Sequence, residues 1–259
     1  MVEVEAYRRT AERALGRRVA EVVAPDDWYL KRGLSAAYVG AALTGRRLTG
    51  ARRLGKLLLL DTDEGDGPVL GLRFGMSGRL LVDGAAGVDD LIYASNRDNP
   101  AWDRFTLRFD GGGDLRVRDP RRLGGVELDP DESRLGPDVG SLRPAALAAA
   151  LAGSEAPLKA RLLDQGRLAG IGNLIADETL WRAGLSPVRP AGSLTPNELR
   201  RLHRHLKGTV ADFLERGGSH TGDLMPERRR GGVCPKDGTP LVRETVGTRT
   251  TYWCPQHQT

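Results

Sequence analysis

Cysteine is scarce in this chain: only two occur among its 259 residues, at positions 234 and 254. A framework of several disulfides, of the kind that holds small secreted domains together, is therefore excluded. Long hydrophobic runs are also missing, and no window approaches the roughly 20 apolar residues that a membrane span needs. The N-terminus is acidic and amphipathic, unlike a signal peptide. These absences predict a protein of a reducing compartment, the cytoplasm.

Lysine is scarce relative to arginine, although the chain is basic, with a net charge of +5 and a pI of about 9.5. A basic balance favours a polyanionic partner. The abundance of Ala, Arg and Gly is also typical of proteins from GC-rich genomes, so arginine content alone does not indicate DNA binding. The length allows one large domain or two medium ones.

The two cysteines belong to a pattern that repeats near the C-terminus. Cys234 is followed three positions later by Asp237, and Cys254 three positions later by His257. This is the spacing of a zinc ribbon, with Asp and His at the places where the second and fourth Cys usually stand. We therefore predict a zinc site formed by these four residues, in which Asp237 is the weakest ligand. The alternative is a plain turn at Asp237 and a frayed terminal His257.

Hydrophobic periodicity divides the rest of the chain into a β-rich part and a helical part. Residues 3–15 predict a helix, and the short strands between residues 17 and 128 indicate a two-layer β-sandwich. The Pro-containing stretch 129–142 is typical of an interdomain linker. Helices are predicted to follow over Pro144–Ala152, from Leu158, over Asn173–Ala183, and from the capping box at Thr195 to about Arg216.

One glycine-rich segment is suited to contact a phosphate. Gly170-Ile171-Gly172-Asn173 precedes a predicted helix, and glycines let backbone N–H groups approach a phosphate closely. We expect Asn173 to cap this helix while its amide contacts the same oxygen. Alone the pattern is weak, because glycines before a helix are mostly structural.

Two tips between predicted strands present side chains suited to a base stack. Met76 stands at a glycine-flanked tip, where an exposed Met can act as a wedge between bases. A buried Met in a turn is the alternative. Asp119–Gly124 forms a second tip, which offers the cation of Arg121 beside the apolar Leu123. Lys56, which precedes an apolar strand, is either a surface lysine or a phosphate contact.

These segments, in this order, resemble the formamidopyrimidine-DNA glycosylase / endonuclease VIII family over essentially the whole chain. The resemblance is carried by Glu3–Arg9, Gly55–Leu59, Phe74–Gly78, Asp119–Gly124, Ile171–Glu178 and the terminal ribbon. It implies an α+β fold with a catalytic β-sandwich domain and an N-terminal helix over 1–128, a linker over 129–142, a helical domain with a helix–two-turn–helix over 143–225, and a zinc-finger β-hairpin over 226–259.

The resemblance also implies a function: a bifunctional DNA glycosylase and AP lyase that flips a damaged base, expected to be an oxidised one, out of duplex DNA in the cleft between the domains. It implies DNA contacts by Lys56, Met76, Arg121, Leu123, Lys159, Asn173 and Arg249. Lys56, Asn173 and Arg249 would hold phosphates, with Lys56 in the catalytic site. Met76, Arg121 and Leu123 would fill the gap left by the base; the family often has Phe at the last position, and Leu stacks less well.

The N-terminus departs from the family pattern. Family members use a free N-terminal amine, usually that of Pro, to form a Schiff base before β-elimination cuts the strand. They typically begin Met-Pro-Glu-Leu-Pro-Glu-Val-Glu, whereas this chain begins Met1-Val2-Glu3-Val4-Glu5. Alignment from the terminus makes Val2 the nucleophile and Glu3 its acid–base partner, whereas alignment from the helix leaves both roles unfilled. We favour Val2 and Glu3, because an α-amine with a pKa of about 8 is partly neutral at cellular pH.

We expect the partners to be damaged double-stranded DNA and Zn²⁺, and the protein to be a monomer associated with the nucleoid. Two other functions stay open. A non-catalytic protein on the same scaffold would bind lesions or abasic sites without turnover. A zinc-ribbon regulator of DNA or RNA would bind intact and abasic duplexes equally well. Oxidised purines, oxidised pyrimidines and crosslinks are all open as substrates.

Overall fold

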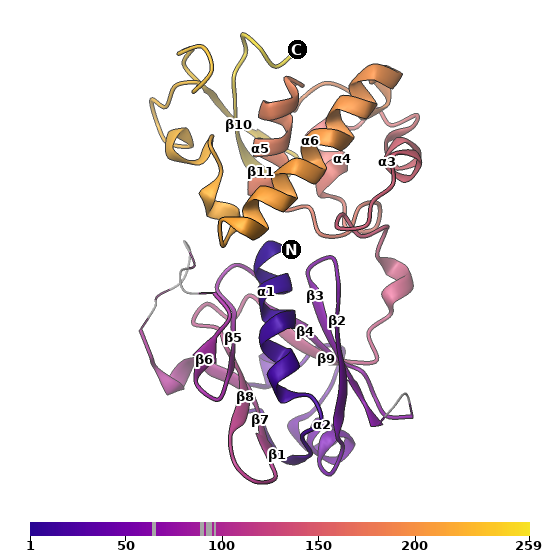
Figure 1. The fold of residues 1–259 in the computed structure, drawn as a ribbon, viewed down its shortest axis with the longest axis vertical. Helices are drawn as coiled ribbons and strands as arrows, with labels where there is room; N and C mark the ends of the chain where they lie inside the picture. The colour runs from indigo at the N-terminus through magenta and orange to yellow at the C-terminus, as the bar shows by residue number, and fades with distance from the viewer. Residues whose placement is uncertain (64–65, 89–90, 92–94, 96) are drawn as a thin grey trace. The chain divides into compact units, whose positions relative to one another are not determined.

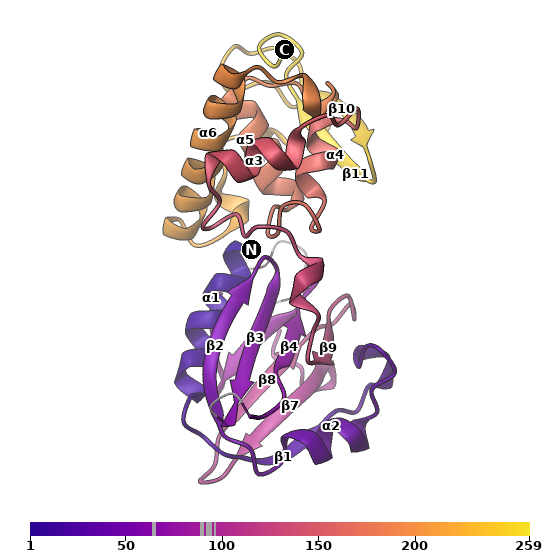
Figure 2. The ribbon, with the colours of Figure 1, turned by 90° about the vertical axis from the view of Figure 1, so that its right-hand side faces the viewer.

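The computed structural model describes residues 1–63, 66–88, 91, 95 and 97–259 of the chain. These residues form two compact units: Glu3–Glu132, and Ser133–Thr259 together with Met1–Val2. Both are drawn in Figures 1 and 2. Among the described residues, none of the helices combines the length and the apolar character needed to cross a bilayer.

The first unit is a two-layer β-sandwich, as the sequence predicts (Figure 2). One sheet has the order β2-β3-β4-β9, and its strands are β2 (Leu48–Leu54), β3 (Leu57–Thr62), β4 (Leu70–Arg73) and β9 (Gly125–Leu128). The other has the order β1-β7-β8-β5-β6, and its strands are β1 (Val19–Val23), β5 (Arg79–Val82), β6 (Ala85–Ala86), β7 (Asp103–Phe109) and β8 (Asp114–Arg118). All strand pairs in both sheets are antiparallel.

The core of this unit collects apolar side chains from both sheets and from the N-terminal helix. Leu58 and Leu72 of one sheet are buried in the same cluster as Phe105 and Val117 of the other. The helix α1 (Val2–Ala11) contributes the face that the period of 3.6 predicts, and its buried members are Val4, Tyr7 and Ala11. A second helix, α2 (Ala36–Leu43), begins after Ser35, whose hydroxyl accepts a hydrogen bond from the backbone N–H of Tyr38.

The second unit packs four helices around its own core. They are α3 (Pro144–Leu151), α4 (Leu158–Leu163), α5 (Asn173–Ala183) and α6 (Pro196–Glu215). The predicted capping box is confirmed: the Thr195 hydroxyl accepts from the Glu198 N–H, and the Glu198 carboxylate accepts from the Thr195 N–H. Gly184, with a φ of 62°, ends α5 as expected. The buried stripe of α6 is Leu202, Leu206, Val210 and Phe213.

The chain ends in a two-stranded hairpin of β10 (Val242–Val246) and β11 (Arg249–Trp253), which lies beside α5 (Figures 1 and 2). A satellite cluster of Trp181, Leu224, Cys234 and Cys254 forms its small core. Short 3₁₀ helices complete the described elements: η1 (Glu12–Ala14), η2 (Asp27–Tyr29), η4 (Pro100–Trp102), η5 (Glu132–Arg134), η6 (Ala191–Ser193), η7 (Ser219–Thr221) and η8 (Met225–Glu227).

Candidate active site and metal centre

Tyr7 connects the N-terminal helix to the turn that carries Met76. The side chain of Tyr7 is 1% exposed, packs on Phe74 with ring centroids 4.5 Å apart, and donates a 3.0 Å hydrogen bond to the Gly78 carbonyl. Burial raises the pKa of Tyr7, and the nearby negative charge of Glu3 raises it further. Tyr7 therefore stays a neutral donor at cellular pH, and Glu3 lies near the same turn.

The two tips predicted to enter a base stack touch each other. Met76 and Leu123 are 47% and 44% exposed, which confirms that both are presented to solvent. Gly75 has a φ of 59°, and a methyl group added there would lie 2.6 Å from Leu123 Cβ. Glycine is therefore required at this position both by the backbone conformation and by the close approach of the second tip. Arg121, in the same tip as Leu123, is exposed as well.

The buried carboxylate of Asp119 joins the two tips. The sequence patterns predict no role of its own for this residue. Asp119 has no exposed surface, and its oxygens accept hydrogen bonds from the Ser77 hydroxyl at 2.5 Å and from the Gly124 N–H at 2.8 Å. A third bond comes from the Arg121 N–H at 3.1 Å. Ser77 follows Met76 directly, so one side chain fixes both segments. In the sequence, the Asp119-Pro120 pair marks the start of a tight turn, but it does not indicate that Asp119 also holds the Met76 turn.

We expect Asp119→Asn to lower the free energy of unfolding by about 2–3 kcal/mol. The amide keeps the shape of the carboxylate but turns an N–H₂ group toward one or more of the three donors, so that buried polar groups lose their partners. Urea denaturation measures the change. Asp110→Asn, at an exposed hairpin position, is the matched control and should change stability by less than about 0.5 kcal/mol. Equal effects of the two substitutions would contradict the role of Asp119.

The remaining predicted catalytic residues lie at the ends of elements. Lys56 is half-buried in the turn between β2 and β3, where Gly55 has a φ of 61°. Glu3 is half-buried in the first turn of α1. Val2 and Met1 are only 3% and 6% exposed, and they belong to the apolar cluster of the helical unit. An amine at Val2 must therefore become accessible before it can react.

In the helical unit, α4 and α5 hold the terminal hairpin through one backbone carbonyl. The Thr250 carbonyl accepts a 3.1 Å hydrogen bond from the Asn173 amide and a second, also of 3.1 Å, from the Lys159 ammonium. Arg249, adjacent to Thr250, is exposed. The structure therefore brings Asn173, Lys159 and the backbone of Arg249 together, although 90 positions separate the last two in the sequence.

The expectation that Asn173 caps α5 is wrong. The N-cap is Gly172, and the Asn173 side chain makes no capping bond because it is directed to the hairpin. Gly170, with a φ of 107°, supplies the left-handed residue of the preceding turn. The second amide atom, Asn173 Oδ1, is buried and has no partner among the described residues. The amide is thus anchored on one side only.

The predicted DNA contact of Lys159 does not agree with its placement. Its side chain has no exposed surface, and the ammonium lies 2.6 Å from Asp177 Oδ1 and 2.7 Å from the Thr251 hydroxyl. Burial lowers the pKa of Lys159, whereas Asp177 opposes that change. Asp177 also binds Arg228 at 2.7 Å. Lys159 is thus closed off from solvent and links α4, α5 and β11.

Lys159→Met is expected to destabilise the protein by about 3–5 kcal/mol, because it removes one partner of a buried ion pair. Lys207→Met is the matched control: Lys207 is exposed on α6 and donates to the Gly140 carbonyl, so a loss below about 1 kcal/mol is expected. Thermal unfolding followed by circular dichroism separates the two variants. A loss of DNA affinity by Lys159→Met at unchanged stability would restore the predicted phosphate contact.

The four residues predicted to bind zinc lie together beside the C-terminal hairpin of β10 and β11. The ligand atoms of Cys234, Asp237, Cys254 and His257 all lie within 4.8 Å of one another, and the cluster can hold a metal ion. Both cysteines are buried. Cys234 Sγ is 3.5 Å from His257 Nδ1, and Cys254 Sγ is 3.3 Å from Asp237 Oδ2. A tetrahedral ion with bonds of about 2.0–2.3 Å has ligand–ligand edges of roughly 3.3–3.8 Å, so these separations fit zinc.

Groups around the cluster orient its ligands. His257 Nε2 lies 3.0 Å from the Trp181 carbonyl, which favours a proton on Nε2 and leaves Nδ1 for a metal. The Trp181 indole N–H donates to Cys234 Sγ at 3.4 Å. The Thr239 N–H, 2.9 Å from Asp237 Oδ1, lowers the pKa of Asp237 and leaves Oδ2 toward the cluster. Trp181 lies in the last turn of α5, and nothing in its sequence context indicates this role.

Two family models match the chain. One, described as the formamidopyrimidine-DNA glycosylase N-terminal domain, matches residues 1–126. The other, described as the formamidopyrimidine-DNA glycosylase H2TH domain, matches residues 135–224. The two matches together cover the β-sandwich and the four-helix region.

Curated relatives and solved structures agree with these matches. The formamidopyrimidine-DNA glycosylase of Symbiobacterium thermophilum is 34% identical, over 99% of this chain and 88% of that protein. That of Arabidopsis thaliana is 32% identical, over 99% of this chain and 70% of that protein. The MutM (Fpg) protein of Thermus thermophilus superposes with a TM-score of 0.79 at 33% identity, covering 100% of this chain and 98% of that one. The Lactococcus lactis Fpg, solved with a FAPY-dG containing DNA, superposes at 0.81 and 25% identity, covering 99% and 98%.

Proposed function

Because the chain belongs to the formamidopyrimidine-DNA glycosylase / endonuclease VIII family, we propose that it is a base-excision-repair DNA glycosylase with AP lyase activity on duplex DNA. The observation that carries the proposal is the likeness over 99% of the chain to relatives named formamidopyrimidine-DNA glycosylase. The adjoining tips of Met76 and Leu123 support it, because exposed apolar side chains on rigid turns suit the gap left by a flipped base.

In the proposed reaction the amine of Val2, freed by removal of Met1, attacks C1′ of the damaged nucleotide. The bond from C1′ to the base breaks, the base leaves with a proton, and loss of the ring oxygen from C1′ gives an imine. Removal of a C2′ proton then expels the 3′ phosphate oxygen, which is the β-elimination. Glu3 is the group proposed to move protons, and its place near Tyr7 and the Met76 turn supports that role.

Borohydride trapping on DNA with an abasic site tests the proposal. Reduction of the imine should give a covalent protein–DNA adduct, and peptide sequencing should place the DNA on Val2. The protein is first shown by N-terminal sequencing to begin at Val2. If the protein that begins at Val2 binds abasic DNA but forms no covalent adduct, the proposed lyase activity is wrong.

A non-catalytic lesion-binding protein is the second candidate, and the burial of Val2 favours it. It predicts tight binding of abasic duplex with no strand cleavage on a nicking gel. A panel of duplexes carrying oxidised purines, oxidised pyrimidines and crosslinks distinguishes the two candidates and identifies the substrate.

We propose that Zn²⁺ occupies the cluster of Cys234, Asp237, Cys254 and His257. Its chemistry there is structural, since four protein ligands leave no open position for a substrate. The ion would fix the loops that support β10 and β11, and with them Arg249. We also propose that the protein acts as a monomer; its expected association with the nucleoid stays a prediction.

Arg249→Ala is expected to weaken binding to duplex DNA and to reduce the slope of log Kd against log salt by about 1, because one phosphate contact is lost. Fluorescence anisotropy over a range of salt concentrations measures both. Arg200→Ala, exposed on α6, is the charge-matched control and should leave the slope unchanged. The same slope for Arg249→Ala and the wild type would show that the hairpin does not contact phosphate.

A further inference from the structure

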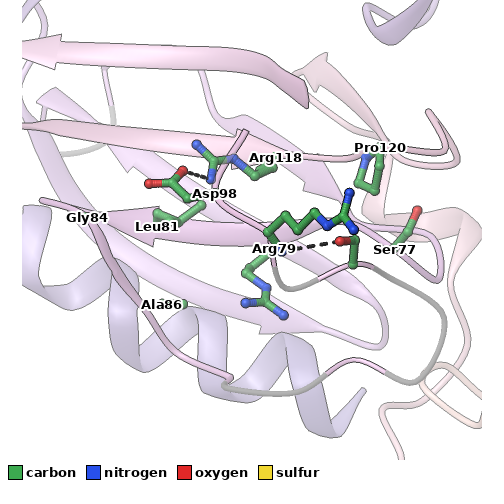
Figure 3. A pocket seen from close by; sticks show the side chains of 10 residues that line it. Ser77, Arg79, Leu81, Gly84, Ala86, Asp98, Arg118 and Pro120 are labelled. Atoms are coloured by element: carbon green, nitrogen blue, oxygen red, sulfur yellow. Dashed lines mark hydrogen bonds and ion pairs between the residues drawn. The ribbon is translucent and has the colours of Figure 1, made fainter. Parts of the chain in front are cut away.

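A cavity of about 170 Å³ opens in the β-sandwich unit, beside the turn that carries Met76 (Figure 3). Its wall includes Ser77, Arg79, Arg97, Asp98, Arg118 and Pro120. Three of these side chains are arginines, and they come from three separate segments: β5, the residues before η4, and the end of β8. Asp98 contributes one carboxylate to the wall, so three arginines and one aspartate give the lining a formal charge of +2.

Two of the arginines lie next to each other on the sheet. Arg79 on β5 and Arg118 on β8 are direct partners in the antiparallel register, and both line the cavity. Two guanidinium groups on one face of a sheet can donate hydrogen bonds to the same phosphate.

Arg118 is held rigidly at this place. It is 6% exposed, and its guanidinium binds Asp103 on the neighbouring strand through Nε at 2.6 Å and Nη2 at 3.1 Å. This bidentate pair fixes the plane of the guanidinium group before any ligand arrives. The cost of ordering a long side chain on binding is therefore small.

The remaining Arg118 nitrogen already contacts an anion that belongs to the chain. Nη1 pairs with Asp98, whose own side chain is 83% exposed (Figure 3). Asp98 follows Arg97 in the sequence, so one short segment brings to the cavity both a cation and a carboxylate that competes with a ligand anion for Arg118. Because Asp98 is open to water, it can turn away into solvent when a phosphate takes its place on Nη1.

We propose that this cavity is an anion site that takes one phosphate group, held by Arg79, Arg97 and Arg118, with Asp98 as the carboxylate that the phosphate displaces. Guanidinium N–H groups are strong donors to phosphate oxygens, and Arg118 would offer Nη1 once Asp98 is displaced. The Ser77 hydroxyl is not a donor to it, because that proton goes to Asp119. Its lining includes Ser77, which directly follows Met76, and does not include Lys56.

Titration of inorganic phosphate into the whole protein, followed by ¹⁵N–¹H NMR at the amides of Gly84 and Ala86 in the cavity wall, tests the site. Arg97→Gln is expected to raise Kd roughly tenfold, as one charge-assisted hydrogen bond is lost. Asp98→Asn is expected to lower Kd roughly threefold, because the competing carboxylate is gone. Both residues lie in a surface segment, so neither change threatens the fold.

Arg108→Gln is the matched control, since Arg108 lies on β7 of the same sheet in an exposed pair with Glu21. Its Kd should stay within about twofold of the wild type. An unchanged or weaker Kd for Asp98→Asn, or equal losses for Arg97→Gln and Arg108→Gln, would overturn the proposal, because binding would then follow net charge alone. The titration contains no DNA, so its failure leaves the glycosylase proposal untouched, and failure of borohydride trapping leaves the cavity untouched.

A second arm identifies the source of the phosphate. If it belongs to the DNA backbone, Arg97→Gln reduces the salt slope of duplex binding by about 1, and free phosphate competes with DNA. If the phosphate titration behaves as expected while the slope is unchanged, the site takes a free phosphate or a strand end, and a 5′-phosphorylated oligonucleotide should then bind more tightly than its hydroxyl counterpart.

Discussion

A protein whose Val2 amine is blocked is expected to lose strand cleavage at abasic sites by at least roughly 10³-fold, because the nucleophile of the proposed reaction is removed. A short Gly-Ser extension placed before Met1, so that Val2 never becomes terminal, makes this change without altering any side chain. Single-turnover cleavage of an abasic duplex measures the rate. The same extension at the C-terminus is the control and should leave the rate unchanged.

Glu3→Gln belongs to the same experiment and should lower the cleavage rate by about 10²–10⁴-fold, the usual contribution of a positioned acid or base. Glu12→Gln, on the exposed 3₁₀ helix that follows α1, is its control. Full cleavage by the extended protein would eliminate Val2 as the nucleophile.

Cys254→Ser is expected to reduce the bound zinc to near zero and to weaken DNA binding by about 100-fold or more. Cys254 has no exposed surface and is part of the small apolar cluster, with Trp181, Leu224 and Cys234, beside the C-terminal hairpin. Structural zinc in small domains supplies about 10–16 kcal/mol of apparent binding free energy, which is also folding free energy. Its loss should therefore unfold the hairpin, and metal analysis and anisotropy should change together.

Two further measurements sharpen this test. Asp237→Asn should retain part of the zinc, because Asp237 is exposed and is the least committed ligand, whereas Thr248→Ala, at the exposed hairpin turn, should retain all of it. A strong chelator should reproduce the Cys254→Ser result with the wild-type protein. Wild-type affinity in a fully zinc-free protein would show that side-chain packing alone holds the hairpin.

Local patterns predicted the elements well because their causes are local. The capping box at Thr195 and Glu198 fixes the start of α6 within four residues of sequence, and the structure confirms it. The start of α5 at Asn173 is also correct, although its predicted side-chain cap is not, because the glycines at 170 and 172 mark the turn before the helix. The resemblance to the family, now shown, supplied the arrangement of these elements, which periodicity alone does not specify.

Contacts between distant segments could not be predicted from local pattern. Asn173 was expected to cap its own helix, but a carbonyl 77 positions away accepts its hydrogen bond. Lys159 was expected to face DNA, yet burial beside Asp177 removes it from solvent. The register that sets Arg79 opposite Arg118 depends on how β5 pairs with β8, and a shift of one residue would place them on opposite faces.

Asp119 links two turns through hydrogen bonds to Ser77, 42 positions away, and to Gly124, so the two turns should open together. Hydrogen exchange offers a direct view of this, because opening of one turn must break the bonds that hold the other. The amides of Gly78 and Gly124 should consequently exchange with a common opening free energy in the wild type. In Asp119→Asn they should exchange independently, because no shared carboxylate would then tie the opening of one turn to that of the other.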